Sequence, residues 1–184
     1  MRKMLINVAD ATVHQGSSGE YFEFSMSELA GAAGAQAIGA NVTRVPPGKA
    51  AFPFHHHYAN EEHFFVLSGS GVLRVGSLRY PVKVHDYVVN LPGGPEEAHQ
   101  LVNTGEDDLV YLAISTAALP EVVGYPDSAR TGVRIAMSQA PGARFLVQDS
   151  AKDAVGYWDG EDGRHVAGIV ASATAPPGCR AERP

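Results

Sequence analysis

Four residues of this chain have the types and the spacing of metal ligands. His55, His57 and Glu62 lie in the stretch PFHHHYANEEHFFVLSGSG, and His99 follows in PGGPEEAHQLVN. Imidazole nitrogens together with one carboxylate suit a mid-to-late first-row divalent ion. Four protein ligands would leave one or two positions open on an octahedral ion, and an open position distinguishes a working site from a structural one. The residues therefore raise the hypothesis of a working metal site.

A β-strand can bring the first two histidines together, because side chains two apart share a face and lie roughly 6.5 Å apart along the chain. His55 and His57 can thus face a barrel interior while the histidine between them points to the opposite face. A loop over Tyr58–Glu61 would lead to Glu62, which begins the next strand on the inward phase. His99 would come from a separate strand on the opposite side of the barrel.

Short alternating runs fill the middle of the chain and favour strands. Two glycines in SGSG, Gly69 and Gly71, fall between two apolar runs and predict a hairpin turn. No extended stretch from 36 to 116 shows helical periodicity, so the fold class is predicted as all-β, a barrel or sandwich. Further strands are predicted over Gln36–Val45, Arg79–His85, Tyr87–Leu91, Ala98–Asn103 and Leu109–Ser115.

The flanks follow the strand pattern less closely. Residues 25–35 allow a short helical turn, and YPDS at Tyr125–Ser128 predicts a turn beyond Pro120. Additional strands are predicted over Val133–Met137 and Ala143–Gln148.

Composition excludes several classes of function. The formal net charge is −6, and the 14 Lys and Arg residues are scattered, so no nucleic-acid surface is expected. The apolar run near the N-terminus is too short for a signal segment, and no window approaches the length of a transmembrane helix. The single cysteine, Cys179, excludes an intramolecular disulfide. The expectation is a cytoplasmic protein without membrane partners.

The spacing of the candidate ligands resembles the first motif of the cupin superfamily. That motif is a glycine, five residues, His-x-His, three or four residues, Glu, six residues and Gly. Here Gly48 is followed by six residues, His55-x-His57, four residues, Glu62, six residues and Gly69.

The second cupin motif, Pro-x-Gly, two residues, His, three residues, Asn, also has a counterpart. Pro92-x-Gly94 is followed by His99, and Asn103 stands at the family's spacing. Four residues rather than two separate Gly94 from His99, and His85 stands where the family usually has a glycine. Neither departure removes a ligand.

Two alternatives remain open at this level. Glu61 competes with Glu62, because a three-residue gap is also allowed and would turn His63 inward, although the spacing to Gly69 favours Glu62. Three adjacent histidines are by themselves more often surface residues. The distant match around His99 is what favours metal ligation.

The resemblance implies a cupin double-stranded β-helix, or jelly-roll barrel, over residues 36–116. An N-terminal segment, 1–35, would pack on the barrel and a C-terminal extension, 117–184, would follow, all in one structural domain. The chain is similar to small bacterial cupins that carry such an extension. The family implies one divalent transition metal ion (Fe, Mn, Ni or Zn) on His55, His57, Glu62 and His99, a small-molecule substrate and a homodimer.

Cupins with this ligand set include dioxygenases, sugar-phosphate isomerases, decarboxylases and non-catalytic binding proteins, so the metal core does not choose among them. The inward phase beside the ligands is expected to be apolar, at Phe64, Val66, Leu101 and Pro53. A phosphosugar pocket would need inward cationic groups, and the cations near the motifs are Arg44, Lys49 and Arg74.

These features slightly favour a metal-dependent enzyme with dioxygenase-like chemistry on a small oxygenated metabolite. A sugar-phosphate isomerase-like enzyme is the alternative, and a non-catalytic, metal-dependent small-molecule binding protein is the second. The sequence identifies no general base.

Overall fold

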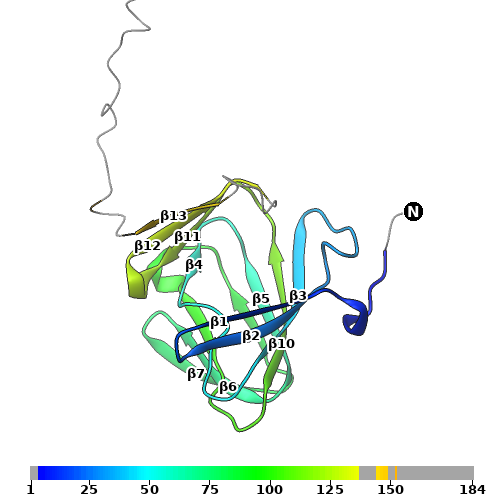
Figure 1. The fold of residues 1–184 in the computed structure, drawn as a ribbon. Helices are drawn as coiled ribbons and strands as arrows, with labels where there is room; N and C mark the ends of the chain where they lie inside the picture. Colours follow the sequence, from blue (N-terminus) through cyan, green and yellow to red (C-terminus); the bar gives the residue numbers. More distant parts are fainter. Residues whose placement is uncertain (1–3, 137–143, 149–151, 153–184) are drawn as a thin grey trace, which may run out of the picture. The chain divides into compact units, whose positions relative to one another are not determined.

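Antiparallel strands and three short 3-10 turns form the regular structure of the described chain (Figure 1). The computed structural model describes residues 4–136, 144–148 and 152, all of which fall within one compact unit spanning Met1–Asp153. The 3-10 turns are η1 (Val8–Asp10), η2 (Pro95–Glu97) and η3 (Pro126–Ser128). The strands are β1 (Val13–Ser18), β2 (Phe22–Glu28), β3 (Ile38–Val45), β4 (His56–His57), β5 (Glu62–Ser68), β6 (Ser70–Val75), β7 (Leu78–Lys83), β8 (Tyr87–Asn90), β9 (His99–Val102), β10 (Leu109–Thr116), β11 (Glu121–Tyr125), β12 (Arg130–Arg134) and β13 (Arg144–Gln148).

The strands form three antiparallel sheets. The largest has the order β1-β2-β3-β10-β5-β8, the second β13-β12-β11-β4, and the third β7-β6-β9. The all-β class is therefore confirmed, and each barrel strand predicted from the sequence has an observed counterpart that differs by a few residues at its ends.

The core lies on the inward faces of the barrel strands. On β5, Phe64 and Val66 are buried while the intervening Phe65 is only partly buried, which is the alternation expected of a half-buried strand. The buried cluster comprises Val45, Ala51, Phe64, Val66, Leu73, Val82, Val88, Leu101, Leu109, Tyr111 and Ala113. Phe64, Val66 and Leu101 thus have the inward orientation that the sequence predicted.

The expected hairpin at SGSG is wrong. β5 pairs with β8 and β10, whereas β6 pairs with β7 and β9, so the chain changes sheets at this point. Gly69 makes this corner with φ of 78°, and a Cβ there would collide with the carbonyl oxygen of Asp108. The glycine therefore serves a tight corner between two sheets instead of a two-strand turn.

Two predictions in the flanks also need correction. Residues 25–28 belong to β2, so the turn expected over 25–35 is confined to the residues after this strand, where the Ala33 N–H donates to the Leu29 carbonyl oxygen. The strand expected over Val133–Met137 lies earlier, at Arg130–Arg134, and Met137 is outside the described residues. The turn at Tyr125–Ser128 and the strand near residue 144 are confirmed by η3 and β13.

Both flanks pair with the barrel. β2 joins β3, so residues 13–28 extend the largest sheet, and β11 joins β4, which carries two of the three adjacent histidines. The division at residues 35 and 116 stays a prediction, and most of the extension lies outside the described residues. Within the part of the chain that the structure describes, no helix has the length and apolar character needed to cross a bilayer.

Candidate metal centre

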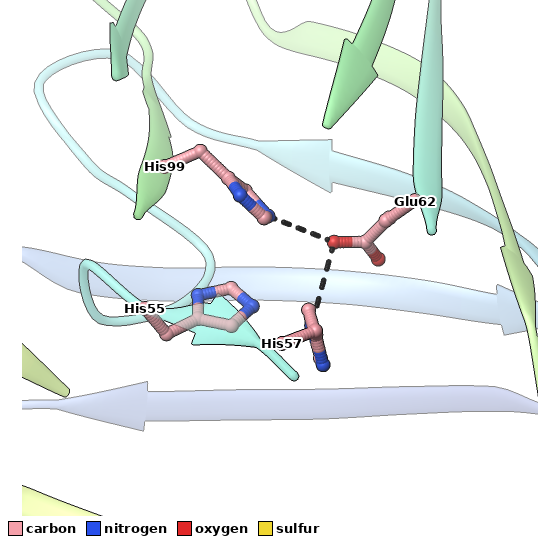
Figure 2. Close-up of side chains that lie close together, drawn as sticks. All are labelled: His55, His57, Glu62 and His99. Carbon is pink, nitrogen blue, oxygen red and sulfur yellow. Dashed lines mark hydrogen bonds and ion pairs between the residues drawn. The ribbon is translucent and has the colours of Figure 1, made fainter. Parts of the chain in front are cut away.

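The four candidate ligands lie close together, as Figure 2 shows. One ligand atom from each of His55, His57, Glu62 and His99 falls within 4.8 Å of all the others. The Oε2 atom of Glu62 is 3.1 Å from Nε2 of His99 and 3.9 Å from Nε2 of His57. His99 is buried, at 2% exposure, whereas the other three residues are partly exposed.

Backbone pairing places these side chains. His55 and His99 form an isolated antiparallel bridge in which each backbone N–H donates to the other's carbonyl, at 3.2 and 2.8 Å. His57 ends β4, and Glu62 begins β5 on the same face as the buried Phe64. Segments far apart in the sequence therefore deliver the ligands to one point, as the two motifs predicted.

Two of the imidazoles are held by backbone carbonyls. Nδ1 of His55 lies 2.8 Å from the carbonyl oxygen of Pro53, and Nδ1 of His99 lies 3.2 Å from that of Glu97. A carbonyl only accepts, so Nδ1 is the donor in each of these bonds. Nε2 of His55 then presents a lone pair to the cluster, which is the tautomer a metal ligand requires, whereas Nε2 of His99 lies 3.1 Å from Oε2 of Glu62.

Burial shifts the pKa values of the cluster. Burial, followed by the charge of His55, lowers the pKa of His57 to about 4, and burial and His99 lower the pKa of His55. Burial alone would raise the pKa of Glu62, but a hydrogen bond from His99 and the nearby imidazoles leave it lowered. Near neutral pH His55 and His57 are therefore neutral and Glu62 is a carboxylate, which are the forms that bind metal.

The competing residues point elsewhere. Glu61 contacts His63 instead of the cluster, with its Oε1 2.6 Å from Nε2 of His63, whose Nδ1 is 2.5 Å from the Tyr87 hydroxyl. Glu62 is thus the carboxylate that the structure brings to the histidines. His56 turns away, as expected, but it is buried, and its Nδ1 lies 2.8 Å from the Gly93 carbonyl oxygen.

Asn103, the last residue of the second motif, has a structural role. Its Nδ2 donates to the carbonyl oxygens of Val45 and Asp107, both at 2.8 Å, and its Oδ1 accepts from the Gly105 N–H. The side chain is fully buried and fixes the loop after β9. Sequence spacing identified this residue, and its contacts explain why an asparagine suits the position.

A cavity of about 580 Å³ opens beside the cluster. It is lined by Phe52, Pro53, His55, His57, Val123, Tyr125, Ser128, Arg130, Gly132 and Arg134. A volume of this size accommodates a small metabolite. Six of these ten residues come from β11, η3 and β12, so the C-terminal extension builds most of the cavity wall.

The expectation of apolar walls beside the ligands is met in part, because Phe52, Pro53 and Val123 line the cavity together with polar and charged residues. Phe64, Val66 and Leu101 belong to the core, while two arginines line the cavity. Arg130 and Arg134 share one face of β12 because they are four residues apart on a strand, and Gly132 between them carries no side chain. The spacing of the two arginines could have indicated that both side chains lie on one face of a strand. The predicted strand began at Val133, however, and so did not include Arg130.

The cations that the sequence placed near the motifs have other roles. Arg44 forms an exposed ion pair with Asp108 at 2.9 Å. Arg74 donates two hydrogen bonds to Asp127, at 2.7 and 2.9 Å, and its guanidinium lies 3.6 Å from the Phe54 ring centroid. Because Asp127 lies in η3, this bidentate contact fastens the extension to the barrel beside the cavity.

A buried carboxyl group lies behind the cluster and was not identified from the sequence. Glu121, the first residue of β11, is fully buried, and its Oε2 is 3.8 Å from Nδ1 of His57. Burial raises the pKa of Glu121 against the opposing effect of nearby backbone N–H groups and Arg134.

The donor set fits a divalent transition ion. Ligand atoms on one such ion, with bonds of about 2.1 Å, lie roughly 3–4 Å apart, so the observed spread of up to 4.8 Å requires only small side-chain movements. Three imidazoles and one carboxylate, with no thiolate in the cluster, favour Fe, Mn, Ni or Zn over Ca or Mg. The cluster is therefore able to hold a metal, whose identity its donors leave open.

Comparison with known families agrees with this geometry. The sequence profile of the Cupin_2 family, the cupin domain, matches residues 41–115. Residues 41–115 therefore form a cupin domain. The matched residues contain all four members of the cluster and run from β3 to β10, so the cupin domain holds the candidate ligands while the cavity wall extends beyond it.

Individual proteins are similar over different lengths. The oxalate-binding protein of Thermotoga maritima is 32% identical over 71 residues, which are 39% of this chain and 55% of that protein. The chain therefore matches about half the length of this curated relative.

Two solved structures match the cupin over most of its length. One is a protein of Acidithiobacillus ferrooxidans provisionally assigned as a sugar phosphate isomerase, with a TM-score of 0.69, 26% identity, and coverage of 84% of this chain and 97% of that one. The other is a sugar phosphate isomerase of the cupin superfamily from Silicibacter pomeroyi, with a TM-score of 0.69, 20% identity, and coverage of 79% and 93%. The second likeness shows the fold alone.

Proposed function

We propose that this cupin is a divalent-metal-dependent enzyme that acts on a small, oxygen-rich anionic metabolite by moving a proton between adjacent carbons. The proposal depends mainly on the cavity, which is lined by two of the cluster histidines and by two arginines. Such a cavity offers one region for oxygen ligands on a metal and another for an anionic group of the same molecule.

Different residues would bind the metal ion and the anionic group of the substrate. His55, His57, Glu62 and His99 would hold the ion, which when bound supplies Lewis acidity to a carbonyl and a neighbouring hydroxyl. The guanidinium groups of Arg130 and Arg134 would bind a phosphate or carboxylate.

The rest of the cavity wall limits solvent access. Phe52, Pro53 and Val123 line it beside the polar groups, and their apolar surfaces reduce the water around a bound substrate. The described residues include no group that the geometry singles out as the base for the proton.

The comparisons support the anionic class of substrate without deciding it. The Acidithiobacillus protein provisionally assigned as a sugar phosphate isomerase is similar over most of both chains. The Thermotoga relative is named for binding oxalate, a small dianion with chelating oxygens.

Dioxygenase-like chemistry, which the sequence slightly favoured, remains the second candidate. That preference depended on apolar walls beside the metal, and the two arginines in the cavity weaken this support, although Phe52, Pro53 and Val123 also line it. The open positions that four protein ligands leave would still suit it. A third candidate, a non-catalytic binding protein, would use the same groups without turnover.

Solvent-hydrogen exchange separates these candidates. The protein loaded with Mn, Co or Zn is incubated without oxygen in heavy water with a panel of phosphorylated and carboxylated hydroxyketones, and proton NMR follows the carbon next to the carbonyl. We expect deuterium to enter that carbon for one member of the panel. The Arg130→Met and Arg134→Met variants should raise KM at least about 10-fold, while Arg79→Met, on exposed β7, should match the unaltered protein.

Other outcomes would point to the alternatives. Exchange absent across the panel, together with oxygen uptake by the iron-loaded protein, would overturn the proposal in favour of oxygenase chemistry. Metal-dependent binding without exchange or oxygen uptake would identify a binding protein.

A further inference from the structure

Three buried side-chain atoms among the described residues have no hydrogen-bond partner, and all three belong to one group of neighbours. They are Nδ1 of His57, Oε2 of Glu121 and Nε of Arg134. The first two lie 3.8 Å apart. Arg134 is opposite Glu121 in the β11–β12 register, and its positive charge lowers the pKa of both His57 and Glu121. Native proteins rarely leave buried polar atoms unpaired, and exceptions concentrate at functional sites.

This group completes a pattern within the cluster. Nδ1 of His55 and Nδ1 of His99 each face a backbone carbonyl oxygen, which fixes the orientation of both rings. Nδ1 of His57 faces a carboxylate oxygen instead. A carboxylate behind a metal-binding histidine fixes its tautomer and raises its basicity, and it does both more strongly than a carbonyl.

Glu121 has little freedom to act otherwise. Its side chain is fully buried, and its Oε1 accepts a hydrogen bond from the Ala59 N–H at 3.3 Å. With one oxygen committed to the loop after β4, the other is directed at His57. Arg134 stands opposite Glu121 in the strand pair, and its positive charge opposes the effect of burial, which raises the pKa of the Glu121 carboxyl.

We propose that Glu121 is a positioning residue for His57: its Oε2 accepts the Nδ1–H of the imidazole and so directs the Nε2 lone pair to the metal position. The inference rests on the proposed metal site. It gives the extension a second role, because β11 supplies this carboxylate and β12 supplies the arginine beside it.

The Glu121→Gln variant tests this directly. The amide oxygen can keep the bond from Ala59, which leaves the NH2 group facing His57 in place of Oε2. A donor at that position favours the opposite tautomer, with the hydrogen on Nε2. Long-range nitrogen–proton NMR on the metal-free full chain, in mildly basic solution, reports which ring nitrogen carries the hydrogen. We expect Nδ1–H in the unaltered protein and Nε2–H in the variant.

Cobalt titration followed by visible absorption gives the second readout. Because partners behind metal ligands typically contribute 10–100-fold in affinity, the dissociation constant for Co(II) should rise by about that factor in Glu121→Gln, with a changed spectrum. Glu61→Gln is the matched control, since it alters a carboxylate that contacts His63 outside the cluster. It should change neither the His57 tautomer nor cobalt affinity.

The outcomes separate the two claims. An unchanged His57 tautomer and unchanged cobalt affinity in a folded Glu121→Gln protein would overturn this inference and leave the metal site standing. If Glu121→Gln changes the tautomer but the unaltered protein binds no cobalt, the proposed function fails while the hydrogen bond to His57 is supported. A Glu121→Leu variant, with an unfolding curve as a check, removes the acceptor altogether and should give a mixture of tautomers.

Discussion

Two imidazoles of the cluster, those of His55 and His57, are uncharged near neutral pH. Burial lowers the pKa of His57 to about 4 and lowers that of His55 as well. Metal binding near neutral pH therefore does not have to displace protons from these two rings. The same burial destabilises the folded protein in acid, because a buried imidazolium loses the hydration that it has in the unfolded chain.

That cost predicts how stability depends on pH. The unfolded chain protonates His57 near 6.5, whereas the folded protein does so near 4, so between these values the unfolded state binds more protons. Acidification across this window should lower the free energy of unfolding of the metal-free protein, by about 3 kcal/mol for His57 alone. Urea unfolding at a series of pH values measures it.

A His57→Gln variant is the comparison for that series. It lacks the titrating ring, so its stability should fall less steeply between pH 6.5 and 4. Parallel curves for the two proteins would show that His57 does not carry the effect.

The four cluster residues could be predicted from the sequence because their constraints are local. A period of two on a strand brings His55 and His57 together, and motif spacing chooses Glu62 over Glu61. Glu121 could not be predicted this way. Its role depends on the pairing of β11 with β4, which brings Val123 opposite His57, and no spacing in the chain encodes that contact.

At the scale of elements, the short strand β4 is the link between barrel and extension. It pairs with β11 through two residue pairs, Val123 with His57 and Gly124 with His56. The barrel strands could be predicted because each carries its own alternation and turn residues. The strand β12 was placed too late in the chain, because its five residues alternate arginine with small or apolar residues and give a weak hydrophobic signal.

Close packing at this link predicts the effect of a methyl group. A Cβ at Gly124 would collide with the imidazole of His56, which is buried and bonded to the Gly93 carbonyl. Gly124→Ala should therefore displace β4 and cost about 1–3 kcal/mol of unfolding free energy. Urea unfolding measures the loss, and cobalt affinity should weaken although Gly124 contacts none of the four ligands.

Gly31→Ala is the matched control. Its added Cβ would meet the end of the flexible Glu28 side chain, which can move aside. If Gly124→Ala is as stable as this control, β4 is not held in place by β11 as described.

At the scale of the whole molecule, the cavity's charge opposes that of the chain. The formal net charge is −6, yet Arg130 and Arg134 line the cavity beside the cluster. Attraction of an anionic metabolite must therefore come from these local groups and not from the overall field. The three segments expected from the sequence are joined by strand pairing, β2 with β3 and β4 with β11. The homodimer and the cytoplasmic location stay predictions.

The central claim is that His55, His57, Glu62 and His99 bind a metal ion, and elemental analysis of the purified full chain tests it most directly. We expect about one divalent transition ion per chain at saturation. His57→Ala and His99→Ala should each lose most of it, while His63→Ala, outside the cluster, should retain it. Metal content that is unchanged in both ligand variants would contradict the account.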